Sequence, residues 1–445
     1  MRIRNSLDTE SLTKSVARFV ADADKHDILA PSLRMAGVAI IDLLGGMLAA
    51  SEEPVTQRLM QFSASDLGPC STLLRSDFRR SATAAALVNG SAAHALDFDD
   101  VQFNAHPSTV LVPALLAAGE RIGCSGAQVL RAYVVGYEVW GELHRREPVP
   151  YHDKGWHPTA VLGVPAAAAA VASLCRLDQE AARTALSLAA SFTGGVVANF
   201  GAMAKPLHAG RAAAAAITSV DMALAGVTAG EDGLAGLLTA LSPQGQVDLS
   251  PSTALGQRYF SIDKPLVFKK YPVCFSAHRP IDALLDLAQL HDISADNVEQ
   301  IVVEIRATQA RVLRFDRPST ALEGKFSMQF AAACALLRRR VTLADLEDGV
   351  VASPAVQQLM ARVRLVERSG SACGQPATCD RVVITLKDGT TIDSGEIAAV
   401  LPHFRLREKF LDCCQAGGRS DGERLLERLE LLDALPDIRQ LAATI

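Results

Sequence analysis

Five short stretches of the chain place Lys, His or Asp side chains beside proline or glycine. Their ionisable and hydroxyl residues are Asp97, Asp99, Asp100, His106 and Ser108; His152, Lys154 and His157; Lys205, His208 and Arg211; Lys269, Lys270 and His278; and Lys325 and Ser327. Each stretch adjoins a segment with few charges and many apolar residues. Charged side chains are seldom buried unless they are paired or functional. We therefore expect these residues to gather around one site.

The chemistry that such a set supports is proton transfer on a small carboxylic acid. Several Lys and His side chains can bind a substrate that carries two or three carboxylates. An Asp or His base can then remove a proton next to a carboxylate, while the cations stabilise the developing enolate. Loss of hydroxide, loss of carbon dioxide, or return of the proton to the other face would each follow from this intermediate.

Each stretch taken alone also has a structural explanation. Asp99 and Asp100 would suit the end of one helix and the cap of the next. The steps His106-Pro107 and His157-Pro158 would suit helix starts, because proline is favoured at the first helical position. Only the combination of the stretches favours a functional site.

Motif searches exclude the common cofactor sites. The chain has no G-x-G-x-x-G after a strand, no G-x-x-x-x-G-K-[ST], no H-E-x-x-H and no G-x-S-x-G. Its nine cysteines are an odd number without any C-x-x-C, which indicates reduced thiols and no zinc or iron–sulfur site. We predict no metal and no organic cofactor, so that an enzyme would work with side chains alone.

Composition narrows the class of protein further. The 445 residues are 49% hydrophobic and 21% charged, which is enough for a large core and for two or three domains. The net charge of −5 is spread along the chain and aromatic residues are only 5%, so we expect no nucleic-acid and no membrane partner. The N-terminus lacks an apolar signal segment, and we expect the uncharged run 184–204 to be a buried helix pair broken by glycine. These features predict a soluble, cytoplasmic protein.

The elements that must position these residues change in character along the chain. Residues 1–265 show helical periodicity and many alanines, for example in a helix with Ser11 or Thr9 as its N-cap and in one over 31–51 that Gly45-Gly46 interrupts. Within 266–398, residues 297–307 alternate as a strand, 381–395 form two strands around Asp388-Gly389, and 325–339 and 353–366 favour helix. Residues 399–445 return to helix. We predict a large all-helical domain (a helical bundle) formed by both chain ends, with a smaller inserted α+β lid domain over 266–398.

Four motifs in order resemble the MmgE/PrpD family, which includes 2-methylcitrate dehydratase, cis-aconitate decarboxylase and iminodisuccinate epimerase. They are NGSAAHALDFDDVQFNAHPSTVLVPALLA, GWHPTAVLGVPAAAAA, KPLHAGRAA and KKYPVCFSAHRPIDA. The resemblance covers about residues 10 to 410. It implies the same two-domain fold, a homodimer, an active site between the domains, and no metal or organic cofactor. The chain departs from the decarboxylase pattern at Val101, where the family's DFDDT has a threonine.

The resemblance also implies site residues. The family's catalytic positions fall on Asp97, His106, His157, Lys205 and Lys269. We expect His157 or Asp97 to be the base, His106 its acid partner, and the two lysines to hold carboxylates. His208, Lys270 and His278 are reserve substrate-binding candidates, because a one-residue slip in the loops would exchange them with their neighbours.

Three functions stay open on the sequence. The first is a cofactor-independent lyase, a dehydratase or decarboxylase, acting on a small di- or tricarboxylate. The second is an epimerase of an iminodisuccinate-like dicarboxylate, which needs two acid/base groups such as His106, His157 and Lys205. The third is an inactive helical scaffold or binding protein, against which the five retained ionisable residues count.

Overall fold

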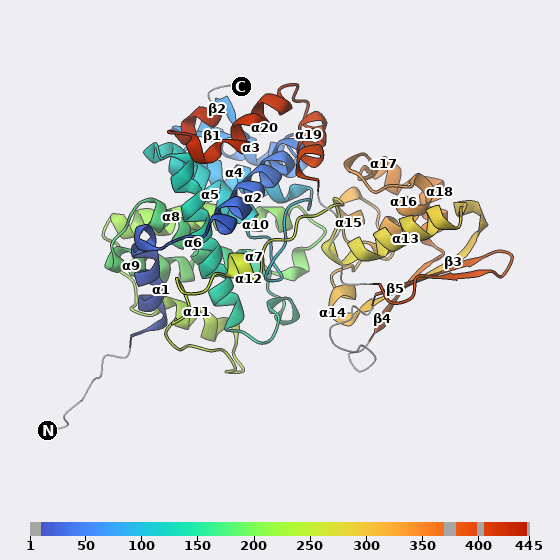
Figure 1. Cartoon of the computed structure of the whole chain (residues 1–445), viewed down its shortest axis with the longest axis horizontal. Coiled ribbons are helices and arrows are strands. Elements are labelled where there is room, and N and C mark those ends of the chain that lie inside the picture. The colour runs from blue at the N-terminus through green and yellow to red at the C-terminus, as the bar shows by residue number, and fades with distance from the viewer. Residues whose placement is uncertain (1–9, 369–379, 398–404, 443–445) are drawn as a thin grey trace.

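A computed structural model describes residues 10–368, 380–397 and 405–442, and it is mostly helical with a small sheet. These residues form two hydrophobic cores, and the elements around them make up the two groups seen in Figure 1. The first core includes residues from Leu12 to Leu266 and from Phe410 to Leu441, and we call this part of the protein the helical body. The second, in the α+β body, takes residues from Tyr271 to Ile392. The predicted mixture of helical and α+β structure is confirmed, while the exact domain limits stay a prediction.

The helical body contains α1 (Leu12–Ala21), α2 (Ala30–Ala49), α3 (Pro54–Phe62), α4 (Ala82–Ala95), α5 (Ser108–Ile122), α6 (Gly126–Arg145), α7 (Pro158–Val161), α8 (Gly163–Leu174), α9 (Gln179–Ser191), α10 (Ala204–Leu224), α11 (Gly233–Leu241), α12 (Phe260–Asp263), α19 (Leu406–Ala416) and α20 (Gly422–Glu430). The alanine-rich helices α4 and α10 pack very closely: a Cβ on Gly90 would lie 2.8 Å from the Cα of Gly210. This close approach brings the C-terminal end of α4 beside the N-terminal end of α10, where several candidate residues lie.

Of the two predicted N-caps of α1, Ser11 is confirmed, because its hydroxyl accepts a hydrogen bond from the backbone N–H of Lys14, while Thr9 lies outside the described residues. The predicted break at Gly45-Gly46 is wrong: α2 runs through both glycines. A Cβ on Gly45 would lie only 3.1 Å from the Phe410 ring of α19, so this glycine allows a close helix contact instead of ending the helix. By length and composition α2 could cross a membrane, but 67% of its apolar window is buried inside the protein.

The first 265 residues also contain a hairpin that the sequence analysis missed. Strands β1 (Cys70–Thr72) and β2 (Arg75–Arg80) pair antiparallel, and Leu73 and Leu74 form the tight turn with positive φ angles. Leucine is an unusual turn residue, so the segment carried no turn signal.

The α+β body is built on a four-stranded sheet with the order β4-β3-β5-β6. Its elements are α13 (His278–Leu290), β3 (Val298–Arg306), α14 (Ala307–Ala310), α15 (Ala321–Gly324), α16 (Met328–Arg338), α17 (Asp348–Val351), α18 (Pro354–Met360), β4 (Val363–Arg368), β5 (Arg381–Leu386) and β6 (Thr391–Asp393). The predicted strand 297–307 and the hairpin around Asp388-Gly389 are confirmed as β3 and β5-β6. The predicted helix 353–366 is wrong beyond Met360, because the rest of it forms β4 and pairs parallel with β3.

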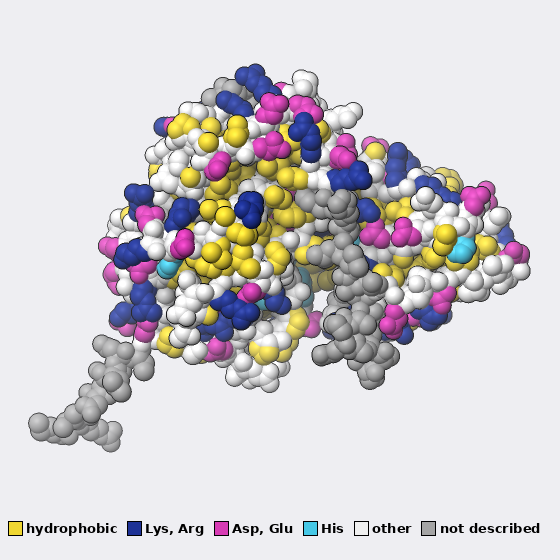
Figure 2. Space-filling view, in the orientation of Figure 1, with side chains coloured by type: hydrophobic (Ala, Val, Ile, Leu, Met, Phe, Trp, Pro, Cys, Tyr) yellow, Lys and Arg dark blue, Asp and Glu magenta, His cyan; other side chains and the backbone are white. Residues whose placement is uncertain are grey.

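The space-filling view shows acidic and basic side chains interspersed over the visible face, without a basic stripe (Figure 2). The predicted buried helix pair over 184–204 is wrong: α9 ends at Ser191, the following residues form a mostly half-buried or exposed connection with one short helical turn (Val197–Asn199), and α10 begins only at Ala204.

Candidate active site

A cavity of about 410 Å³ lies between the two bodies. From the helical body it is lined by Asp97, Val101, Gln102, Phe103, Asn104, Ala105, His106, Pro150, His152, Asp153, Phe200 and Lys205, and from the segment that connects the two bodies by Val267 and Lys269. From the α+β body it is lined by Cys274, Phe275, Ser276, Thr308, Gln309, Val312 and Phe326. The seam between the bodies therefore encloses four of the five predicted catalytic residues, the exception being His157.

Asp97 lies at the centre of the charged groups in this cavity. It follows the end of α4 with a φ of +50°, and its two carboxylate oxygens contact different lysines. Lys205, near the start of α10, donates to Oδ1; Lys269 donates to Oδ2 at 2.7 Å and to the Asp97 carbonyl, also at 2.7 Å. Burial by itself raises the pKa of Asp97, but the two ammonium groups hold that pKa well below its ordinary value. Asp97 is therefore a permanent anion with both oxygens engaged.

Aromatic rings and backbone carbonyls hold the two lysines in place. The Lys205 ammonium lies 5.3 Å from the centre of the Phe200 ring and 4.7 Å from that of Phe326, which belongs to the α+β body. Burial lowers the pKa of Lys269, but the charge of Asp97 outweighs it and raises the pKa overall. Both lysines therefore present fixed positive charge at the cavity.

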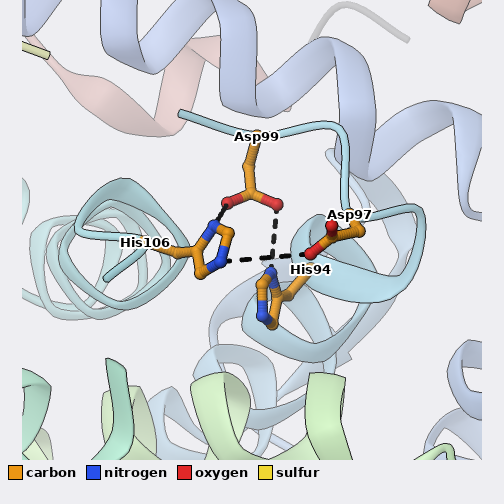
Figure 3. Close-up of side chains that lie close together, drawn as sticks. All are labelled: His94, Asp97, Asp99 and His106. Atoms are coloured by element: carbon orange, nitrogen blue, oxygen red, sulfur yellow. Dashed lines mark hydrogen bonds and ion pairs between the residues drawn. The ribbon is translucent and has the colours of Figure 1, made fainter. Parts of the chain in front are cut away.

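His106 forms the next layer of the site, together with Asp99 and His94 (Figure 3). One oxygen of Asp99 lies 2.5 Å from Nδ1 of His106, and the other lies 3.0 Å from Nδ1 of His94. The Nε2 atom of His106 is 4.0 Å from Oδ1 of Asp97. Burial lowers the pKa of His106 below its ordinary value, although the charge of Asp99 opposes the shift. A neutral imidazole thus faces the cavity beside a fixed ion cluster.

His157 lies behind this cavity and does not line it. Its side chain is fully buried, with Nδ1 at 3.1 Å from Nδ1 of His208 and its ring 6.5 Å from the His106 ring. Burial holds the pKa of His157 well below its ordinary value, so this side chain is neutral.

The three reserve candidates also lie away from the cavity. His208 contacts His157, and His278 is fully buried with Nε2 at 3.3 Å from the carbonyl of Val273. Lys270 points to the other side of the chain, where it pairs with Asp282 at 2.7 Å. It borders a separate groove beside α19. The structure thus separates these three from the cluster around Asp97.

Four residues outside the predicted catalytic and substrate-binding set also contribute. His94 contacts Asp99, His152 lines the cavity, and Lys325 donates to the Ala95 carbonyl at 2.7 Å from the α+β body. Lys409 of α19 pairs with Asp42 at 2.7 Å and donates to the carbonyls of Phe98 (2.6 Å) and Lys269 (3.1 Å). His94 is part of the motif AAHALDFDD, and His152 and Lys325 lie in two of the charged stretches, so three of the four carried a local signal. Lys409 carried no local signal, because its role depends on contact with Phe98, which is more than 300 residues away in the sequence.

One ligand atom each from His94, Asp97, Asp99 and His106 lies within 4.8 Å of the others, which is close enough for a metal ion. The charges around this group argue against it. Both oxygens of Asp97 already bind lysine ammonium groups, and both oxygens of Asp99 already bind imidazole nitrogens. A cation would have to displace Lys205 or Lys269 and would then lie beside their charges. The residues therefore fit an organic anion better than a metal.

Comparison with known proteins gives matches along most of the chain. The MmgE/PrpD N-terminal domain matches residues 14–248, and the MmgE/PrpD C-terminal domain matches residues 271–430. The chain is 30% identical to cis-aconitate decarboxylase of Mus musculus, over 96% of this chain and 92% of that protein. It is 28% identical to the Homo sapiens cis-aconitate decarboxylase, over 90% and 87%. A 2-methylcitrate dehydratase of Cupriavidus necator is 27% identical, but only over 31% of this chain and 30% of its own.

Proposed function

The chain belongs to the MmgE/PrpD family and is a lyase of the type found in it, and on this premise we propose that it removes a proton next to a carboxylate of a small di- or tricarboxylate. Loss of hydroxide from the resulting intermediate completes a dehydration. In a decarboxylation the proton returns to the carbon skeleton, and the carbanion left when carbon dioxide departs takes up a second proton. The observation that carries the proposal is the meeting of Lys205 and Lys269 on the single carboxylate of Asp97, at a cavity that His106 also lines.

Charge explains why this cavity suits an acid. Two ammonium groups share one carboxylate, so Asp97, Lys205 and Lys269, which all line the cavity, together carry one excess positive charge. A substrate carboxylate can bind there as the second anion without any large rearrangement. Because the ammonium groups are buried and already positioned, they can also stabilise enolate charge that develops next to that carboxylate.

The proton step is assigned to His106. Asp97 is an unsuitable base because its pKa lies far below neutrality, and both of its oxygens already accept hydrogen bonds. His157, the other candidate base, does not line the cavity. His106 is neutral and lines it, so its Nε2 atom can accept the substrate proton and return it to carbon or to a leaving hydroxide.

Epimerisation is the second candidate, and one observation favours it. His152 lines the same cavity from the short helical turn Tyr151–Lys154, whereas His106 lies just before the start of α5. Burial lowers the pKa of His152 to about 4, so it too is neutral at physiological pH. Two neutral imidazoles from different segments could serve opposite faces of one carbon. A cofactor-free reaction, a homodimer and a cytoplasmic location remain predictions under either function.

The test is product identification by proton NMR in D₂O with excess EDTA. The panel comprises cis-aconitate, 2-methylcitrate, citrate and iminodisuccinate, and Lys205→Met is the inactive reference. New alkene signals that require Lys205 establish the lyase and identify its substrate. Exchange of hydrogen for deuterium next to a carboxylate without elimination would favour the epimerase. No change in any of the four acids would refute the proposal for these substrates.

A further inference from the structure

We propose that Asp99 is a positioning residue that fixes the tautomer of His106, so that Nε2 is the basic nitrogen facing the substrate. This inference rests on the proposed function, because it specifies the state in which His106 begins the reaction. It also assigns a task to His94, whose contact with Asp99 has no other role in the mechanism above.

The hydrogen-bond partners of His106 determine where its proton lies. Nδ1 is 2.5 Å from Oδ2 of Asp99 and 3.2 Å from the carbonyl oxygen of Asp100. Both partners are acceptors, and the Asp99 carboxylate is ionised, because the neighbouring imidazoles outweigh its burial and hold its pKa well below the ordinary value. Nδ1 must therefore carry hydrogen. In a neutral imidazole the other nitrogen, Nε2, then has the free lone pair.

The position of Nε2 makes this tautomer useful. It lies 4.0 Å from Oδ1 of Asp97, the oxygen that Lys205 contacts, and the ring lines the cavity. The backbone of His106 is held as well: its N–H donates to the Thr159 hydroxyl at 3.1 Å, and its carbonyl accepts from Thr109 at 2.7 Å. A base that starts deprotonated at Nε2 can accept a substrate proton directly and becomes an imidazolium that Asp99 stabilises.

His94 keeps Asp99 in the required orientation. Its Nδ1 lies 3.0 Å from Oδ1 of Asp99, the oxygen that His106 does not use, and its ring packs 4.4 Å from the ring of His106. Asp99 is 2% exposed, so water has little access to replace either contact. The titratable or charged groups that act on the His106 ring are Asp97, Asp99, His94, His152, His157, Lys205 and Lys269.

The adjacent residue Asp100 offers a matched control. It is equally buried, but its side chain turns away from His106 and accepts from the backbone N–H of Ser108 at 3.3 Å. Burial raises the pKa of Asp100 well above its ordinary value, so asparagine reproduces the protonated carboxyl. Asp100→Asn leaves the carbonyl contact to His106 in place, because that contact is made by the backbone.

The first test needs no substrate. Protein labelled with ¹⁵N at histidine gives two-bond proton–nitrogen spectra that distinguish the two tautomers, and His106→Gln assigns the signals. We expect His106 in the Nδ1–H form in the wild type and in Asp100→Asn. Finding His106 in the Nε2–H form in the wild type would overturn the proposal, even if the proposed lyase activity were confirmed.

The second test measures activity. Leucine at position 99 removes both acceptor oxygens without adding an amide that could donate to either ring. We expect Asp99→Leu to lower kcat by about 10²- to 10⁴-fold with little change in KM, the range for loss of a positioned acid/base group. Asp100→Asn should retain wild-type kcat. A folded Asp99→Leu protein with wild-type kcat would refute the positioning role. If Asp99→Leu does not fold, the wild-type tautomer still decides the question.

Discussion

Replacing Asp97 by asparagine tests whether this carboxylate holds the site together. The side chain is 2% exposed and contacts Lys205 (3% exposed) and Lys269 (0% exposed). Asparagine keeps the shape but removes the charge between two buried ammonium groups. Breaking a buried ion pair from one side costs about 3–5 kcal/mol. We expect the low end of that range, because Lys269 keeps the Asp97 carbonyl and Lys205 keeps its two aromatic rings.

The assay is thermal unfolding followed by circular dichroism. A loss of about 3 kcal/mol corresponds to a fall in Tm of roughly 6–12 °C, since about 1 kcal/mol shifts the Tm of a large domain by roughly 2–4 °C. The pKa of Asp97 is lower in the folded protein than in the unfolded chain, where it is near about 4. The ionised carboxylate therefore stabilises the fold fully above that unfolded pKa, and this contribution is lost as pH falls through the folded pKa. The difference between wild type and variant should therefore be constant between pH 5 and 8. The control is Asp77→Asn, which removes an exposed ion pair with Arg75 and should leave Tm unchanged. An Asp97→Asn protein that melts with the wild type would refute the reasoning.

Three further predictions concern other parts of the molecule. Burial raises the pKa of Glu138 to about 7, so between about 4.5 and 7 the folded protein keeps a proton that the unfolded chain has released. The free energy of unfolding should therefore fall as pH rises through that interval. In Tm measured against pH, Glu138→Gln should lack this fall. Lys409→Met removes the ion-pair partner of buried Asp42 and the hydrogen-bond donor to the carbonyls of Phe98 and Lys269. We expect the free energy of unfolding in urea to fall by about 3–5 kcal/mol. Equal unfolding midpoints for wild type and variant would count against this role of Lys409. Lysines already occupy both oxygens of Asp97, so we expect no divalent metal to bind there. Treatment with excess EDTA followed by dialysis should therefore leave turnover unchanged. Activity that is lost on this treatment and restored by a divalent metal would contradict the prediction.

The sequence was most informative where local chemistry decides structure. The Ser11 cap, the alternation of 297–307 and the Asp388-Gly389 turn each predicted the observed element, because each signal lies within a few residues. For Asp97, His106, Lys205 and Lys269 the local signal was weaker: they lie in charged stretches beside apolar helices, and the resemblance to the family singled them out from the other candidates. All four line one cavity.

Predictions failed or were incomplete where the decisive contact is distant in sequence. Gly45 suggested a helix break, but its neighbour in space is Phe410 of α19. Residues after Met360 suggested more helix, but pairing with β3 makes them a strand. His157 was expected at the site, and only the packing of α10 shows that it contacts His208 and lies behind the cavity.

The central claim is that His106 moves a proton at a carbon next to a carboxylate of the substrate. The most direct measurement is the rate at which that hydrogen is removed in D₂O with EDTA, followed by proton NMR for the wild type and for His106→Asn with a substrate that the wild type converts. We predict that the variant stays folded and removes the hydrogen at least about 100-fold more slowly, because it lacks the acid/base group. Removal at the wild-type rate in His106→Asn would contradict the account and assign the base to another residue at the cavity.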